Sequence, residues 1–140
     1  MKKYDSRGNR RPDDIVKAEK LKSGVLLFEG QPIMKLNKGD RLELATLDGK
    51  GIVRVRNWKG GDAGDIIFAM FLRDTKSVEE PYSFKEKGVS LSSGGGLLGK
   101  PGRFLVLNGM ASGQPVRAAF VLMDPQAWIS AFTLFPEFKR

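Results

Sequence analysis

Two residue types are missing from this chain of 140 residues, which contains no cysteine and no histidine. Without cysteine there is no disulfide framework, thiolate nucleophile or zinc–thiolate site. Without histidine, the commonest general base and the commonest transition-metal ligand are missing. A carboxylate-only metal site stays open, but the acidic residues are scattered and show no EF-hand spacing. We therefore expect no metal, no cofactor and no enzymatic activity.

Long apolar runs are also missing. No run approaches the roughly 20 residues that a membrane span needs, and the start Met1-Lys2-Lys3 is not followed by the apolar segment of a secretory signal. The expectation is a soluble intracellular protein, cytoplasmic or nucleoid-associated, with no membrane partner. Hydrophobic residues make up 41% of the chain, which is enough for one domain with its own core.

The stretch GGGLLGKPG, residues 94–102, lacks one part of a phosphate-binding loop. Gly94, Gly99 and Lys100 have the spacing of that motif, but Pro101 stands where a Ser or Thr would hold magnesium. The residues that follow indicate a strand, whereas a phosphate-binding loop opens a helix. We expect a cationic hairpin loop, with Lys100 and Arg103 adding positive charge beside a nucleic-acid site.

Positive charge is abundant: 24 basic and 16 acidic residues give a net charge of +8. Small basic domains are typical of nucleic-acid binders, although ribosomal, membrane-surface and phage proteins share this composition. Residues 1–23 hold half of the net charge and few apolar residues, which favours a flexible arm. A solvated tail without a specific contact is the alternative. Within it, residues 15–21 suit a short helix or a strand about equally.

From Gly24 onward the pattern predicts antiparallel strands, because short apolar runs alternate with breaks rich in Gly, Asp and Asn. Asp48-Gly49 is a strong signal for a two-residue hairpin turn between two of them. The expected strands cover residues 25–28, 33–36, 41–47, 52–58, 66–73, 82–91, 104–107 and 116–123. One helix follows, so residues 24–140 are expected to form a single α+β domain, mainly a curved antiparallel sheet with a C-terminal helix.

The C-terminal helix is predicted over residues 124–135. Asp124 suits the N-cap and Pro125 the first helical position. Trp128, Phe132 and Phe135 recur on one face of this helix. We expect this aromatic stripe to pack against the sheet as core, with a partner groove or base stacking as the alternative.

The strand around residues 52–58 carries the strongest functional signal. Because side chains alternate along a strand, Arg54, Arg56 and Trp58 share a face, with Lys59 at its end. Guanidinium groups pair with phosphates and an indole stacks on unpaired bases, so this face favours single strands or looped RNA over duplex DNA. An ordinary solvated face is the alternative.

Other basic residues extend this hypothesis. The run over residues 66–73 is apolar on both faces, which predicts a central strand, and Arg73 ends it. If the strands pair in sequence order, Arg73, Lys85 and Lys87 join Arg54 and Arg56 on one surface. Charges spread over both faces are equally compatible with the pattern. The last basic candidate on a strand is Arg117.

The segments VRVRNWKGG, DIIFAMFLRD and FKEKGVSLSS resemble the strand region of the positive cofactor four family, and LMDPQAWISAF is similar to its strand–helix junction. The resemblance covers about half the chain. About thirty residues separate the third segment from the helix here, an order that loosely resembles the larger Whirly relatives. The resemblance implies a single-stranded nucleic-acid binder, dimeric or larger, with the sheet as its binding face.

Together these features predict a protein that binds single-stranded DNA or RNA with weak sequence preference and forms a homo-oligomer. The alternative is a protein-interaction or assembly module without nucleic-acid binding, which an exposed apolar patch around Phe132, Phe135 and Phe138 would favour.

Overall fold

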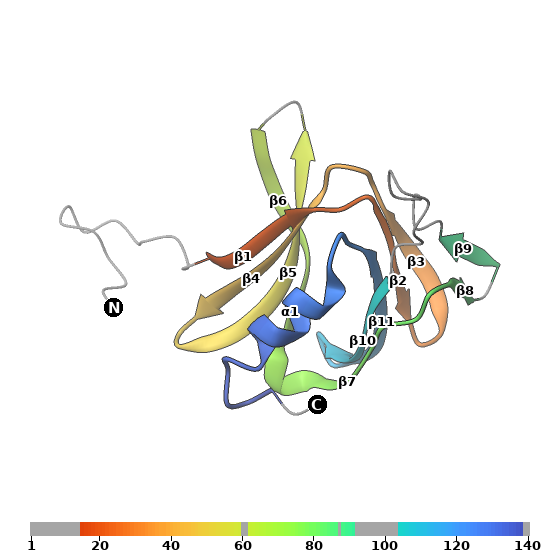
Figure 1. The fold of residues 1–140 in the computed structure, drawn as a ribbon. Coiled ribbons are helices and arrows are strands. Elements are labelled where there is room, and N and C mark those ends of the chain that lie inside the picture. The colour runs from red at the N-terminus through yellow and green to blue at the C-terminus, as the bar shows by residue number, and fades with distance from the viewer. Residues whose placement is uncertain (1–14, 60–61, 87, 92–103, 139–140) are drawn as a thin grey trace.

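The computed structural model describes residues 15–59, 62–86, 88–91 and 104–138. Eleven strands and one helix follow the order β1 Ile15–Lys20, β2 Ser23–Phe28, β3 Gln31–Leu36, β4 Arg41–Leu47, β5 Lys50–Lys59, β6 Asp62–Phe71, a 3-10 turn η1 Leu72–Asp74, β7 Thr75–Glu79, β8 Phe84–Glu86, β9 Val89–Leu91, β10 Phe104–Ala111, β11 Gln114–Val121 and α1 Pro125–Phe132. The fold is mostly antiparallel β with one C-terminal helix, as predicted (Figure 1).

The first sheet has four antiparallel strands in the order β1-β4-β5-β6. Asp48 and Gly49 form the predicted tight turn between β4 and β5, and both have positive φ, 52° and 79°. This turn sets a register that runs from Leu47 opposite Lys50 to Arg41 opposite Arg56. The hairpin of β5 and β6 extends beyond the rest of the molecule (Figure 1).

The second sheet has five strands in the order β3-β2-β11-β10-β7. Two hairpins in it use the same turn conformation as Asp48-Gly49, at Glu29-Gly30 and Ser112-Gly113, where all four residues have positive φ. Strands β8 and β9 form a separate two-stranded hairpin. The described chain therefore builds two larger sheets and a small hairpin, all antiparallel, which is consistent with the predicted curved-sheet fold.

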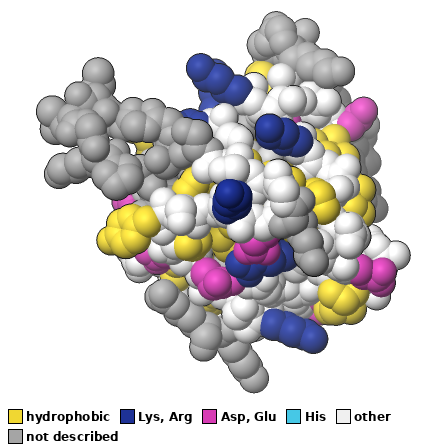
Figure 2. Space-filling view, turned by 90° about the vertical axis from the view of Figure 1, so that its right-hand side faces the viewer, with side chains coloured by type: hydrophobic (Ala, Val, Ile, Leu, Met, Phe, Trp, Pro, Cys, Tyr) yellow, Lys and Arg dark blue, Asp and Glu magenta, His cyan; other side chains and the backbone are white. Residues whose placement is uncertain are grey.

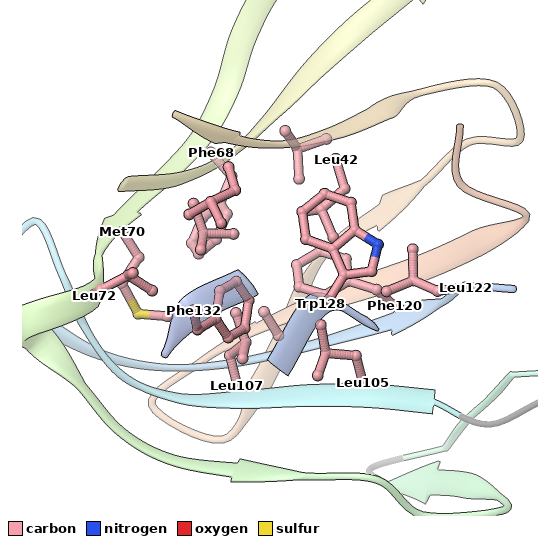
Figure 3. Close-up of a cluster of buried hydrophobic side chains, with 14 of the residues drawn as sticks. Leu42, Phe68, Met70, Leu72, Leu105, Leu107, Phe120, Leu122, Trp128 and Phe132 are labelled. Carbon is pink, nitrogen blue, oxygen red and sulfur yellow. The ribbon is translucent and has the colours of Figure 1, made fainter. Parts of the chain in front are cut away.

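The core lies between the facing sides of the two larger sheets and includes α1 (Figure 3). Trp128 and Phe132 are fully buried in it, and Phe135 packs against it. The Trp128 indole donates Nε1–H to Glu19 Oε1 at 3.0 Å, which satisfies its buried donor and joins α1 to β1. A second, smaller apolar cluster fills the space between the other face of the five-stranded sheet and the β8–β9 hairpin.

The helix begins as predicted and ends earlier. Asp124 is the N-cap and accepts a hydrogen bond from the Ala127 backbone N–H at 3.3 Å, with Pro125 at the first helical position. The helix ends at Phe132, three residues before the predicted end. Its aromatic stripe is core, as expected. Among the described residues, no helix is long and apolar enough to cross a membrane.

Several boundaries differ from the sequence-based expectation. Residues 15–20 form β1, paired with β4, although they were assigned to the flexible arm; residues 1–14 lie outside the described residues. The predicted strand over 82–91 is two short strands, β8 and β9, and β7 was not predicted. Strand β6 was expected to be central, but among the described strands it lies at the end of its sheet and pairs with β5 alone.

Candidate nucleic-acid interface

The four-stranded sheet has an inner face, which joins the core, and an outer face. Residues directly opposite one another in antiparallel strands share a face. One cross-strand row on the outer face consists of Lys20, Arg41, Arg56 and Ile66. A second row, beside it, consists of Ala18, Glu43, Arg54 and Ala69. The alternation predicted for β5 is thus confirmed, and the register adds Lys20 and Arg41 to its basic side.

Arg41 and Trp58 form the most distinctive contact of the outer face. The Arg41 guanidinium carbon lies 3.9 Å from the centroid of the Trp58 ring. A guanidinium this close to the face of an indole is a favourable cation–π arrangement. Both side chains are partly exposed. In the described part of the chain, Arg41 makes no ion pair with a carboxylate.

Arg54 has a different environment from the one that its place in the pattern suggested. It is only 5% exposed, and its Nε–H donates to Glu43 Oε1 at 2.8 Å. Glu43 itself is 1% exposed. Arg56 donates Nε–H to the other Glu43 oxygen at 3.3 Å and Nη1–H to the Gly64 carbonyl at 3.0 Å. Both arginines therefore have structural partners, and Arg56 is the more exposed of the two.

Arg73 reaches the same face from the end of β6. It is exposed, and its guanidinium carbon lies 4.7 Å from the ring centroid of Phe71. Phe71 lies opposite Ile52, on the outer face with Arg54. The outer face therefore carries two contacts between an arginine and an aromatic ring, Arg41 with Trp58 and Arg73 with Phe71.

Lys85 and Arg117 do not join this surface, because the chain passes after η1 into the second sheet. The predicted grouping assumed pairing in sequence order and is wrong on this point. Lys85 is exposed on β8, and the side of the molecule with β3, β8 and β9 shows basic, acidic and hydrophobic side chains intermixed (Figure 2). The side chain of Lys59, together with Lys87, Lys100, Arg103 and the loop at 94–102, lies outside the described residues.

Arg117 on β11 is enclosed by carboxylates. Its Nε–H lies 2.8 Å from both carboxylate oxygens of Glu86, and its Nη1–H donates to Glu79 and to Asn108 Oδ1. The hydrogen bond to Glu86 raises the pKa of Arg117, and Arg117 in turn lowers the pKa of Glu79 from its usual 4.5. This network attaches the β8–β9 hairpin to the five-stranded sheet, so Arg117 has a structural role.

The apolar patch that would favour an interaction module is not an exposed surface. Phe132 is 0% and Phe138 is 8% exposed, and their rings pack together with centroids 5.4 Å apart. The described residues also hold no group of three or more acidic side chains placed to bind a metal ion.

Lys20 and Arg41 were missed by sequence reasoning, although a signal for Arg41 was present. The Asp48-Gly49 turn fixes the register of its two strands, and counting outward from it places Arg41 opposite Arg56. No comparable signal places Lys20, because β1 pairs with β4 across twenty residues of intervening chain. Searches of family models, curated proteins and solved structures give no match to this chain.

Proposed function

We propose that this protein binds single-stranded DNA or RNA, with weak sequence preference, through the outer face of its four-stranded sheet. The observation that carries the proposal is the contact of Arg41 with the Trp58 ring, in the middle of a cross-strand row of cations formed by Lys20, Arg41 and Arg56. A cation fixed beside a partly exposed indole can contact the phosphate of a nucleotide while the indole stacks on a base of the same strand.

The roles of the cations differ. Lys20 and Arg41 carry no described carboxylate partner and supply the phosphate contacts. Arg56 is held by Glu43 and the Gly64 carbonyl, so its guanidinium is fixed in place beside Arg41 and contributes a positive field. Arg54 is buried and supports the sheet. Trp58 supplies the stacking surface, which any base can use, so we expect weak sequence preference.

The net charge of +8 supports a polyanionic ligand. The partly exposed indole distinguishes single strands from duplex, whose base faces are covered by stacking. No feature of the outer face selects between DNA and RNA.

The test is a comparison of two charge-matched double variants. Lys20→Gln with Arg41→Gln removes two cations from the outer face. Lys35→Gln with Lys38→Gln removes two exposed lysines at and just after β3, in the other sheet. Loss of two phosphate contacts should weaken oligo-dT binding about tenfold or more and reduce the slope of log K against log salt by about 1–2. The control pair should change binding less than about twofold.

Tryptophan fluorescence provides the readout, because Trp128 is fully buried and Trp58 is partly exposed. We expect oligo-dT to quench the emission, and a duplex of the same length to have little effect. Equal weakening by both double variants would show that net charge alone drives binding. An unchanged affinity in the Lys20/Arg41 variant would refute the outer face as the site.

A further inference from the structure

Strand β6 has a sequence that does not suit its place at the end of a sheet. Residues Ile66–Phe71 form the run IIFAMF, which is apolar on both faces and contains no charge and no proline. Yet β6 pairs only with β5 in the described sheet. Ile66 is 45% exposed, and Ala69 is also exposed. A run of this kind is typical of a strand that is buried on both faces.

The other strands at the ends of the two larger sheets are protected against pairing with another chain. Strand β1 carries Lys17, Glu19 and Lys20; β3 contains Pro32 and Lys35; and β7 is five residues long with Lys76 and Glu79 among them. Charges, proline and short length are the usual means of blocking an edge. In the described part of β6 the protection lies in its first half, where the pairing with β5 is irregular on both sides of Ile66 and Asp65 is exposed. A regular run from Phe68 to Phe71 follows.

A hollow of about 270 Å³ lies beside β6. Its lining includes Ile67 and Phe68 of β6, Phe28 and Ala111 of the second sheet, and Ser112 of the turn between β10 and β11. Polar and apolar groups both line it, and a strand laid along β6 would cover it.

We propose that the occupant is the β6 strand of a second copy of this chain, paired antiparallel about a two-fold axis. The distribution of charge along β6 favours this partner and this direction. Asp65, near its beginning, is exposed. The exposed Arg73 follows its end, beside the half-buried Asp74. Antiparallel pairing places Asp65 of one copy near the exposed Arg73 of the other, twice, whereas parallel pairing places like charges together. A two-fold interface also closes on itself and forms no fibre.

The resulting dimer joins two four-stranded sheets into one. The two-fold axis of an antiparallel strand pair is perpendicular to the sheet, so the outer faces of both copies lie on the same side. This dimer does not depend on the proposed function. If both hold, the two outer faces form one longer binding surface.

The test is the dissociation constant of the free protein, measured by sedimentation velocity on the full chain without nucleic acid. We expect a species of twice the 15.5 kDa chain mass. Ile66→Lys adds a charge to the edge of β6 and should weaken self-association at least about tenfold. The control is Met123→Lys, the same kind of change at a residue that is 81% exposed and outside β6; it should leave the dimer unchanged.

A second measurement on the unmodified protein covers the case in which Ile66→Lys does not fold. Backbone amide exchange in residues 66–71 should slow as the protein concentration rises through the dissociation constant, while the edge strand β3 exchanges at a constant rate. A monomer at all concentrations, an equally stable dimer of folded Ile66→Lys protein, or concentration-dependent protection at β3 and not at β6 would overturn the proposal. None of these results bears on oligonucleotide binding by a single copy.

Discussion

At the scale of single residues, the outer face shows how one residue type takes two roles within a few ångströms. Arg54 is buried against Glu43, whereas Arg41 is partly exposed on Trp58. The period of the strand identifies the face that each side chain occupies, and it did so correctly for Arg54, Arg56 and Trp58. It contains no information on which cation meets a carboxylate, because that depends on the neighbouring strand.

Glu43 is the residue whose loss should affect stability most directly. Its carboxylate is 1% exposed and accepts hydrogen bonds from both Arg54 and Arg56. Glu43→Gln leaves the buried Arg54 cation without this negative charge, and breaking a buried ion pair in this way costs about 3–5 kcal/mol. The free energy of unfolding in urea measures the loss. Glu29→Gln, an exposed turn residue, should change it by less than about 0.5 kcal/mol.

A loss at Glu43 no larger than at Glu29 would contradict this account of the pair.

The same contacts determine which variants report on binding. Arg54→Ala would remove a partner of a buried carboxylate, so a weakened affinity in that variant would reflect a damaged sheet as much as a lost phosphate contact. Lys20 and Arg41 have no described carboxylate partner, so substitutions there test phosphate binding without breaking an ion pair of the described structure.

At the scale of elements, local signals succeeded where one short segment of chain decides the structure. The Asp48-Gly49 turn and the Asp124-Pro125 helix start are formed by residues adjacent in sequence. Strand β1 was ambiguous because its inward positions are polar: Lys17 lies over the Trp128 ring at 5.4 Å and Glu19 accepts from its indole. Only the distant tryptophan makes those residues suitable for a strand against the core.

Arg117 holds Glu79 of β7 as well as the β8–β9 hairpin, and its contact with Glu79 gives a testable response to pH. Arg117 lowers the pKa of Glu79 below 4.5. A carboxylate with a lowered folded-state pKa contributes stability above its unfolded pKa and loses that contribution as the pH falls through the lower, folded value. We expect the Glu79 carboxyl to titrate below 4.5 by NMR, and to move back toward 4.5 in Arg117→Met.

Amide exchange in β8 and β9 should also accelerate in Arg117→Met at neutral pH, because the same side chain holds Glu86 of β8. Lys85→Met removes a cation from the same hairpin at an exposed position and serves as the control. If Glu79 titrates at the same pH in both variants, Arg117 is not the cause of the lowered pKa.

At the scale of the whole molecule, the sheet order was the property least accessible from sequence. The chain leaves the first sheet at η1 and enters the second, and no local pattern marks this exchange. Strand β10 and η1 lie very close together where the chain changes sheets. A Cβ at Gly109 would lie 2.2 Å from the Asp74 carbonyl oxygen, so this close approach requires glycine at position 109. The reason for that glycine is visible only once both segments are placed. Lys85 was misplaced on the basic surface for this reason.

Net charge gives the two proposed associations opposite responses to salt. If Lys20 and Arg41 each neutralise one phosphate, log K for oligo-dT falls with log salt with a slope of about −1.4. Raising salt from about 50 to about 300 mM then weakens binding roughly tenfold. Pairing of two chains that each carry +8 is opposed by their mutual repulsion, which the same salt screens, so self-association through the apolar β6 edge should strengthen.

Fluorescence titration with oligo-dT and sedimentation velocity without it, on the same protein at the same salt concentrations, compare the two equilibria. A dimer that weakens with salt in parallel with oligonucleotide binding would indicate an interface held mainly by the two pairs of Asp65 with Arg73, and not by the uncharged run Ile66–Phe71. A dimer that strengthens while oligonucleotide binding weakens requires two different surfaces on one sheet, an apolar edge and a basic outer face. The arrangement of β6 beside Arg56 and Trp58 provides both.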